Sequence, residues 1–293
     1  MTEAAALPLV ARRRALLEAL RRNPLLLTGA VIALVLVLVA VLAPLLAPHP
    51  GDAGTATNPV ASLLPPSAQH LFGTDQVGRD LLSRVIYGTR ISLRIAALVL
   101  ASSMVVGVPL GLAAGYFGGW IDAVIMRVTD VFLAFPALLL SLALAAVLTP
   151  SVGNATIAIA VTWWPWYARL ARGQAASVAG RPFIEGCRAL GVPPTRTLLR
   201  HVLPNSITPV IVQASLDVGG IILTAAALSF LGLGAQDPTP EWGLMVSQGQ
   251  SYFTTQWWLV TFPGAAILLA ALAFNLVGDG LREVLDPRRI QRR

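Results

Sequence analysis

The segment from Arg181 to Asn205 reads RPFIEGCRALGVPPTRTLLRHVLPN and separates two long hydrophobic runs. Pro182 suits the first turn of a helix, and Gly191 is placed to take the left-handed conformation that caps helix C-termini. Two prolines after Gly191 end that helix, and a second short helix is expected to run until Pro204 breaks the chain. The sequence therefore predicts a helix, a glycine bend and another helix in a polar region flanked by apolar ones.

The composition of the whole chain is that of a membrane protein. Apolar residues make up 56% and charged residues 12% of the 293 positions, and the mean hydropathy is +0.72, far from the balance of a soluble domain. A span needs roughly 20 mostly apolar residues, and six runs qualify, so the chain is predicted to be all-α with six transmembrane helices. The runs are Leu25–Ala47, Ile91–Gly115, Ile125–Leu148, Ala155–Leu170, Ser206–Leu233 and Leu259–Leu281. The fourth run is the weakest, because it is short and is interrupted by three tryptophans and a proline.

The orientation of these spans follows from the arginines, because all 21 basic residues are arginine. Five precede the first run, six lie at the end of the fourth run or between it and the fifth, and five follow the sixth. Six spans put these three groups on one side, which the positive-inside rule assigns to the cytoplasm. The net charge of +7 is explained by this topology and by attraction to anionic lipid, so no nucleic-acid partner is expected.

This topology divides the chain into five parts. They are a cytoplasmic segment 1–24, an additional N-terminal span 25–47, an extracytoplasmic loop 48–90 that contains an amphipathic helix, a five-helix core 91–281 that includes the polar segment 181–205, and a basic cytoplasmic tail 282–293. The first run could instead be a secretory signal, but it exceeds the 7 to 15 residues of a signal core. Its removal would also leave five spans and place the new N-terminus outside.

The chain offers no recognisable catalytic set. Without lysine it cannot form the phosphate-binding loop G-x-x-x-x-G-K-[ST], and the metalloprotease and serine-hydrolase motifs are absent from the sequence. The single cysteine, Cys187, allows no disulfide framework and is interpreted as a packing residue. The histidines His49, His70 and His201 show no metal-ligand spacing. We therefore expect no enzyme activity, no metal and no cofactor on this chain.

Within the polar segment, Glu185, Gly191 and the pair Leu203-Pro204 have the spacing of the EAA loop, by which permease subunits of ABC importers contact their ATPases. The segment resembles that loop, although Gly186 and Cys187 replace the usual alanines. The resemblance implies an ATPase-coupling surface. The residues assigned to it are Phe183, Ile184, Glu185, Arg188, Ala189, Leu190, Gly191 and Pro204. The alternative is an amphipathic loop that rests on lipid headgroups.

Further blocks narrow the resemblance to one branch of these permeases. They are FGTDQVGRDLLSRVIYGTRISL (Phe72–Leu93), GVPLGLAAGYFGGWID (Gly107–Asp122), RHVLPN (Arg200–Asn205), LSFLGLG (Leu228–Gly234), PTPEWG (Pro238–Gly243) and FNLVGDGLREVLDPR (Phe274–Arg288). They look like the C-type permease of dipeptide, oligopeptide, glutathione and nickel importers. One departure is that Ala225 and Ala226 follow Thr224, where the family commonly has an acid.

This resemblance implies the type I ABC importer permease fold and a set of partners. These are a homologous B-type permease, two ATP-binding subunits that hold ATP and Mg²⁺, and an extracytoplasmic substrate-binding protein. Short peptides are favoured as the substrate, because no histidine or cysteine lies in the predicted spans, and glutathione and nickel remain alternatives. The rival interpretation is a secondary transporter or channel, which commonly uses an intramembrane acid or histidine relay.

The outer loop has two interpretations. Asp75, Arg79 and Asp80 precede an amphipathic pattern that predicts a helix at the outer interface, with Asp75 as its cap. These three residues could form a docking surface for the binding protein, or Asp75 and Arg79 could form a local clasp that fixes the loop.

Polar residues in the spans are candidates for the translocation path, since charge in hydrocarbon usually faces a cavity or a partner. Asp217 lies midway along the fifth run with Gln213 one turn before it, and Asn275 lies in the sixth run. Asp130 is expected to pair with Arg127, one turn away on the same helix.

Overall fold

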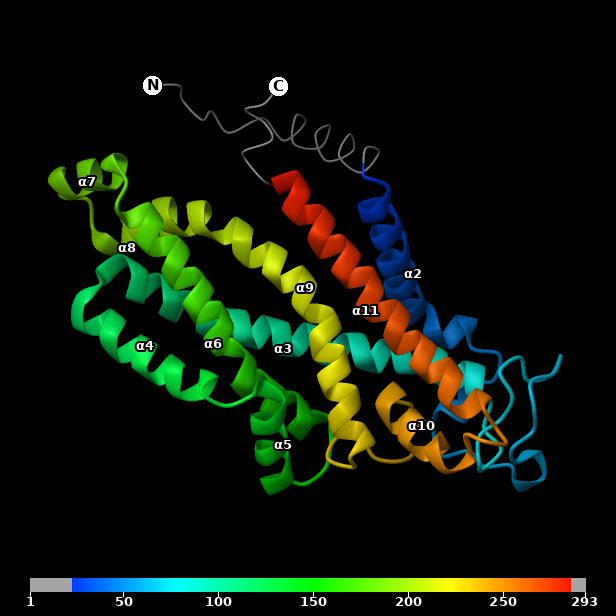
Figure 1. Ribbon diagram of the computed structural model, residues 1–293. Coiled ribbons are helices and arrows are strands. Elements are labelled where there is room, and N and C mark those ends of the chain that lie inside the picture. Colours follow the sequence, from blue (N-terminus) through cyan, green and yellow to red (C-terminus); the bar gives the residue numbers. More distant parts are fainter. Residues whose placement is uncertain (1–22, 286–293) are drawn as a thin grey trace.

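The computed structural model describes residues 23–285, and the regular elements in this range are helices, with one isolated bridge between Thr74 and Asp80 (Figure 1). The prediction of an all-α chain is confirmed. In chain order the helices are α2 (Pro24–Leu46), η1 (Pro50–Ala53), η2 (Pro59–Ala61), α3 (Leu81–Phe117), α4 (Gly119–Leu133), α5 (Ala137–Val147), α6 (Val152–Ala179), α7 (Pro182–Ala189), α8 (Pro194–Thr197), η3 (Leu198–Val202), α9 (Leu203–Phe230), α10 (Trp242–Gly249), η4 (Gln250–Tyr252) and α11 (Trp258–Leu285).

Among the described residues, four helices are long and apolar enough to cross a membrane. They are α2, α3, the helix that runs through α8, η3 and α9, and α11. A bent pair, α4 and α5, could form a fifth span. The predicted fourth span lies in α6, which is 28 residues long but falls outside this apolar set. The indole and guanidinium groups of α6 lower its hydropathy, so length and composition support up to five of the six predicted spans.

The predicted third span is broken in the middle. α4 ends at Leu133 and α5 begins at Ala137, and the two helices are bent by 82°. Pro136 is the cause, because a proline disfavours helical backbone in the residue before it and has no N–H to continue the helix. Pro136 itself has an extended ψ of 126° and becomes the N-cap of α5.

The predicted amphipathic helix of the outer loop is not a separate interfacial element. It forms the first turns of α3, a continuous helix of 37 residues. Asp80, and not Asp75 as expected, caps this helix, because its Oδ2 accepts hydrogen bonds from Ser83 N at 2.8 Å and Ser83 Oγ at 2.7 Å. The loop is thus anchored directly to the start of a membrane helix.

A stripe of glycines packs α3 closely against α6. A Cβ atom on Gly107, Gly111 or Gly115 would lie 2.4 Å, 2.2 Å or 2.3 Å from backbone carbonyl oxygens of α6. Small residues allow such a close approach of two helices in a membrane. The surface that these glycines form therefore packs against a helix of the same chain.

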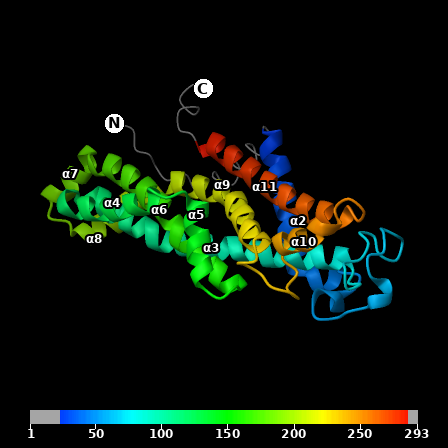
Figure 2. The same cartoon turned by 60° about the horizontal axis from the view of Figure 1, so that its bottom comes forward.

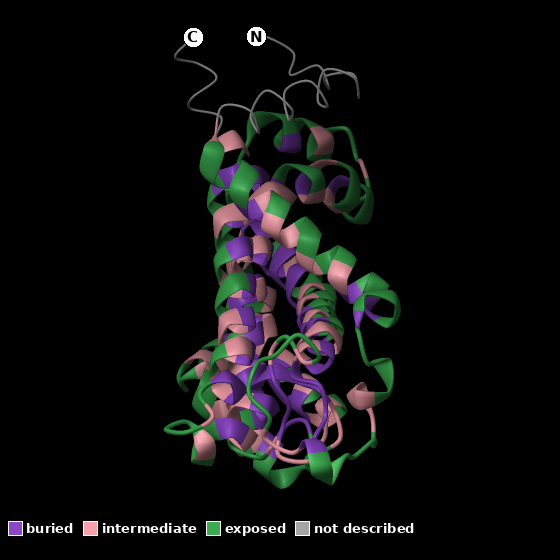
Figure 3. Ribbon diagram, turned by 90° about the vertical axis from the view of Figure 1, so that its right-hand side faces the viewer, coloured by how far each residue is buried: buried purple, intermediate pink, exposed green. Residues whose placement is uncertain are grey.

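The helices place the polar segments at two opposite ends of the molecule. α7 and α8 lie at the same end as the beginning of α2 and the end of α11 (Figure 1). α10 and the loop between α2 and α3 lie at the other end, as Figure 2 also shows. Figure 3 shows that buried residues gather in the loops of that second end and along the inner faces of the helices. The arginine groups of segment 1–22 and of 286–293 lie outside the described residues.

Candidate functional site

α7 is a short helix with a defined start and end. Pro182 occupies its first turn, as predicted. At its C-terminus, Gly191 has φ +71°, its N–H donates to Arg188 O at 3.0 Å, and Val192 N donates to Cys187 O at 3.0 Å. This pair of bonds is the Schellman motif, and it confirms the prediction that Gly191 caps the helix in the left-handed conformation.

α7 is anchored to the core by Ile184. This side chain is 0% exposed and packs in a cluster with Tyr116 of α3, Val178 of α6 and Val202 of η3. The expectation that Ile184 is part of the partner-facing surface is therefore wrong, because its side chain is buried in the chain's own core. A second contact comes from Arg188, whose guanidinium carbon lies 5.1 Å from the centroid of the Tyr116 ring.

The remaining residues assigned to the coupling surface are exposed, and α7, which holds most of them, lies at one end of the molecule (Figure 1). They are Phe183, Glu185, Arg188, Ala189, Leu190, Gly191 and Pro204. Leu190 is 85% exposed and Phe183 is 44% exposed. An exposed apolar pair beside a carboxylate and a guanidinium is a surface suited to a protein partner.

The connection from this segment to α9 differs from the prediction. Pro204 does not break the chain, because α8, η3 and α9 run on as one helix. η3 is a π-helical turn in which Leu203 N donates to Leu198 O, five residues back. The wider turn shifts the hydrogen-bond register just before Pro204. Pro204 therefore lies in the first turn of α9, where its missing N–H breaks no hydrogen bond within that helix. A single continuous helix therefore links the coupling segment to the membrane region.

A groove of about 560 Å³ lies between α6 and α9 and brings together two of the predicted path residues. Asp217 Oδ2 accepts a hydrogen bond from Tyr167 Oη at 2.6 Å, and Asp217 Oδ1 accepts one from Gln213 Nε2 at 2.9 Å. The groove is lined by Trp163, Trp166, Arg169, Leu170, Gln213 and Asp217. It combines aromatic walls with one carboxylate held by two donors.

The structure does not place the other polar residues of the predicted spans, Asn275 and Asp130, as expected. Asn275 is not among the groove-lining residues; its amide donates to Ala271 O at 2.8 Å on its own helix, where α11 packs against Gly219. Asp130 pairs with Arg169 of α6 and not with Arg127 as expected, because the α4–α6 packing brings the Arg169 side chain to it. Tyr167 was missed by the sequence analysis, and the available signal was its position directly after Trp166 and one helical turn after Trp163.

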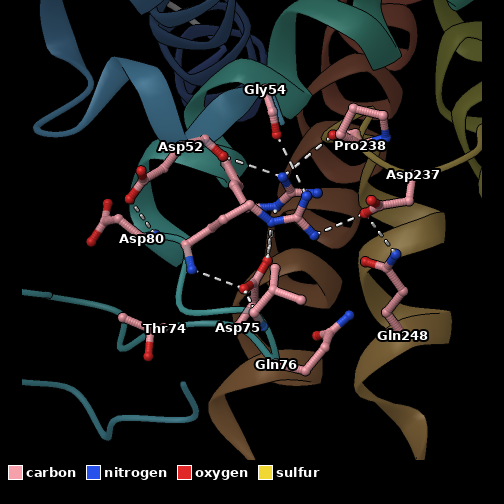
Figure 4. A network of polar contacts seen from close by, with 12 residues as sticks. Asp52, Gly54, Thr74, Asp75, Gln76, Asp80, Asp237, Pro238 and Gln248 are labelled. Atoms are coloured by element: carbon pink, nitrogen blue, oxygen red, sulfur yellow. Dashed lines mark hydrogen bonds and ion pairs between the residues drawn. The ribbon is translucent and has the colours of Figure 1, made fainter. Parts of the chain in front are cut away.

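At the opposite end, three buried residues and one exposed aspartate form a charged network, which we call the arginine clasp (Arg79, Arg84 and Asp75, with the exposed Asp237). Arg79 Nε donates to Asp75 Oδ2 at 2.6 Å, and Arg79 Nη2 donates to Asp237 Oδ1 at 2.8 Å (Figure 4). Arg84 Nε lies 3.5 Å from the same Asp75 oxygen. Of the two interpretations of this loop, the geometry matches the local clasp. Asp75, Arg79 and Asp80 are all buried, so their side chains do not present a docking surface themselves.

The clasp extends the predicted Asp75–Arg79 pair to a distant loop, which the sequence did not indicate. Burial on its own lowers the pKa of Arg79, but the hydrogen bonds to Asp237 and Asp75 outweigh it and raise that pKa. Burial raises the pKa of Asp237, and the hydrogen bond from Arg79 outweighs this and holds the pKa below its ordinary value. Both groups are therefore ionised at neutral pH, and the clasp joins the outer loop to the loop between α9 and α10.

Comparison with known proteins agrees with this architecture. Residues 107–291 match the family model described as binding-protein-dependent transport system inner membrane component. The chain belongs to this family. Residues 13–66 of the permease also match the model of the N-terminal transmembrane domain of oligopeptide transport permease C.

Relatives of this permease cover most of its length. It is 49% identical to the probable D,D-dipeptide transport system permease protein DdpC of Escherichia coli, over 92% of this chain and 89% of that protein. It is 45% identical to the dipeptide transport system permease protein DppC of Alkalihalophilus pseudofirmus, over 92% and 88%. It is 44% identical to the glutathione transport system permease protein GsiD of Pectobacterium atrosepticum, over 76% and 74%.

A solved structure shares the fold of this permease. The MetNI methionine ABC transporter, in an inward-facing crystal form, superimposes with a TM-score of 0.55 at 15% identity, over 70% of this chain and 98% of the other. At this identity the likeness concerns the fold alone. The protein is thus a multi-pass inner-membrane permease subunit with the fold of an ABC importer permease, as its sequence predicted.

Proposed function

We propose that this permease is half of the translocation pore of an ATP-driven importer of short peptides, and that α7 is the element that couples it to an ATPase. The observation that carries the proposal is the construction of α7. The helix is pinned to the core through Ile184 and ended by Gly191, and it leaves Leu190 and Phe183 exposed at one end of the molecule. A helix that is fixed to its own subunit and apolar on its outer face can transmit the movement of a bound partner as a rigid lever.

The partners proposed for this subunit are a B-type permease, two ATP-binding subunits and an extracytoplasmic binding protein. The proposed orientation places α7 and both chain ends in the cytoplasm and the arginine clasp outside. ATP closes the ATPases, α7 follows them, and the unbroken helix from α8 to α9 carries that movement toward the groove. The relation is allosteric, because nucleotide occupancy at one subunit biases two states of the pore in another. ATP chemistry would occur on the partner subunits.

Short peptides are the proposed substrate because relatives at 45–49% identity over most of the chain are named as dipeptide permeases. The groove supports this choice. Asp217 offers a carboxylate that can interact with the ammonium group of a peptide, and Trp163 and Trp166 offer apolar surface to side chains. Glutathione is the second candidate, because GsiD is 44% identical and glutathione is itself a small peptide with an ammonium group.

The experiment that tests the proposal compares Glu185→Arg with Thr195→Ala in native membrane vesicles that contain the whole complex. Glu185 and Thr195 are both exposed in the coupling segment, but only Glu185 is assigned to the ATPase contact. We expect Glu185→Arg to lose peptide uptake and substrate-stimulated ATP hydrolysis while the chain remains in the membrane, and Thr195→Ala to retain both. Normal uptake by Glu185→Arg would refute the coupling role of α7, and uptake by the isolated chain driven by a proton gradient would favour a secondary carrier.

A further inference from the structure

Three side chains from separate parts of the outer loop meet at one point. His49 follows the end of α2, His70 lies in the loop that leads to α3, and Asp80 is the N-cap of α3. His70 Nδ1 lies 2.9 Å from Asp80 Oδ1, and His49 Nδ1 lies 3.8 Å from the same oxygen. One ligand atom from each of the three residues lies within 4.8 Å of the others. The sequence spacing of the histidines had given no sign of this cluster.

Asp80 is held in place by bonds that leave one of its oxygens to the histidines. Its Oδ2 accepts hydrogen bonds from the backbone and the hydroxyl of Ser83, and its N–H donates to Asp52 Oδ2 at 2.8 Å. The same Ser83 hydroxyl accepts from His49 N at 3.0 Å, so it fixes the backbone of one histidine as well. The Asp80 side chain is 1% exposed. The carboxylate is thus a rigid, buried group with Oδ1 aimed at two imidazoles.

A hydrogen bond between one histidine and one carboxylate does not account for this arrangement. Only the His70 nitrogen is within hydrogen-bond distance of Asp80 Oδ1, yet His49 turns the equivalent nitrogen toward the same atom. The two rings face each other with centroids 5.1 Å apart and planes tilted by 36°. Two nitrogens and one oxygen therefore converge on a common point, as the ligands of a metal ion do.

The donor set selects a class of metal. Zn²⁺ takes imidazole nitrogen and carboxylate oxygen at about 2.0–2.2 Å in a tetrahedron, and such bonds separate neighbouring ligand atoms by about 3.3 Å. The observed separations of 2.9 Å and 3.8 Å from Asp80 Oδ1 bracket that value, and all three ligand atoms lie within 4.8 Å of one another. Ca²⁺ and Mg²⁺ prefer six or more oxygen ligands, and this cluster offers one carboxylate and two nitrogens.

We propose that His49, His70 and Asp80 form a Zn²⁺ site at the outer face of this permease, with a water molecule as the fourth ligand. The ion would tie the end of α2 to the start of α3 through the loop between them. Ser83 supports the site because it orients Asp80 and the backbone of His49, as partners of ligating residues do in metal sites. This proposal does not depend on which substrate the permease carries or on the coupling role of α7.

The test uses the whole transporter complex, purified without an affinity tag on this chain, treated with a chelator and dialysed. The probe is Zn²⁺ alone, and bound metal is measured by titration and by elemental analysis. We expect His49→Ala and His70→Ala each to weaken binding by at least about 10-fold, the lower end of what is lost when only a supporting group is removed. His201→Ala is the matched control, because this third histidine lies in η3, at the other end of the molecule.

A second readout separates metal ligation from folding. Zn²⁺ should raise the melting temperature of the wild type and of His201→Ala, and it should leave that of His49→Ala and His70→Ala unchanged. Substitution by Co²⁺ should give the visible absorption of a tetrahedral site in the wild type, and His70→Ala should lose it. Equal Zn²⁺ binding by the wild type and the double variant His49→Ala/His70→Ala would overturn the proposal.

Discussion

Arg79 Nη2 lies 2.8 Å from Asp237 Oδ1, although 158 positions separate the two residues. This hydrogen bond joins the loop before α3 to the loop after α9, so the first and the last thirds of the described chain are linked outside the membrane helices (Figure 4). This end of the molecule is therefore fixed by charge pairing as well as by helix packing.

Removal of Arg79 should strongly destabilise the end of the molecule that holds the arginine clasp. Arg79→Ala leaves Asp75, which is 4% exposed, as a buried carboxylate whose closest cationic partner is lost. Breaking a buried ion pair on one side costs about 3–5 kcal/mol. Thermal unfolding of the purified complex measures this loss, and Arg196→Ala, at an exposed position, is the control. An unchanged melting temperature for Arg79→Ala would contradict the structural role of the clasp.

Acidification should weaken the same contact, because the pKa of Asp237 is held below its ordinary value of 3.8. A carboxylate with a lowered folded-state pKa stabilises the protein above its unfolded-state pKa, and this contribution is lost as the pH falls through the folded-state value. We expect the melting temperature of the wild type to fall more steeply than that of Asp237→Asn below about pH 4. Parallel curves for the two proteins would show that Asp237 is not linked to stability.

Two glycines test the packing of α3 against α6. A Cβ on Gly111 would lie 2.2 Å from Ala168 O, whereas a Cβ on Gly173 would have no neighbour within 4 Å. Gly111→Ala should therefore destabilise the protein by about 1–3 kcal/mol through overpacking. Gly173→Ala should be neutral or stabilise by up to about 1 kcal/mol, because alanine is the better helix former. Chemical or thermal unfolding compares the two, and similar behaviour of both variants would be inconsistent with the tight seam.

A second pair of glycines tests the bend that ends α7. Gly191 has φ +71°, and alanine there costs roughly 1–2 kcal/mol because its Cβ crowds the following carbonyl. Gly186 lies in the helix with open space around it, so Gly186→Ala should strengthen α7. We expect Gly191→Ala, and more severely Gly191→Pro, to lower transport and stimulated ATP hydrolysis. Gly186→Ala should retain both, and full activity of Gly191→Pro would argue against a defined α7.

The groove is tested by substrate selectivity. Asp217→Asn removes the negative charge and keeps the shape of the side chain, so uptake of peptides with a free ammonium group should fall while ATPase docking persists. Ser215→Ala on the same helix is the control, because its hydroxyl is bonded to Ile211 O of its own helix. Unchanged uptake of several peptides by Asp217→Asn would remove this residue from the translocation path.

The sequence predicted the features that depend on neighbouring residues. Pro182 and Gly191 act where local backbone rules place them, and the hydrophobic runs predicted α2, α9 and α11 with small shifts of their ends. The blocks quoted from the sequence led to the family that the comparisons establish.

Features that depend on distant residues were not predictable in this way. The Arg79–Asp237 bond, the Arg169–Asp130 pair and the meeting of His49 with His70 all follow from how helices and loops pack. The rule that proline ends a helix also gave the wrong result at one of two positions, because the surrounding structure decides whether the helix continues. Pro136 broke a predicted span, whereas Pro204 did not break its helix, because a π-helical turn absorbed it.

Site-specific photo-crosslinking at Leu190 tests the coupling role of α7 most directly. Leu190 is 85% exposed on the proposed ATPase-facing surface, and Leu45, 82% exposed on α2 at the other end of the molecule, is a control of matched exposure. In native membranes we predict that a photoreactive residue at position 190 crosslinks to an ATP-binding subunit, and that the same residue at position 45 does not. Crosslinking of position 190 to lipid alone, in membranes that transport peptide normally, would contradict the account.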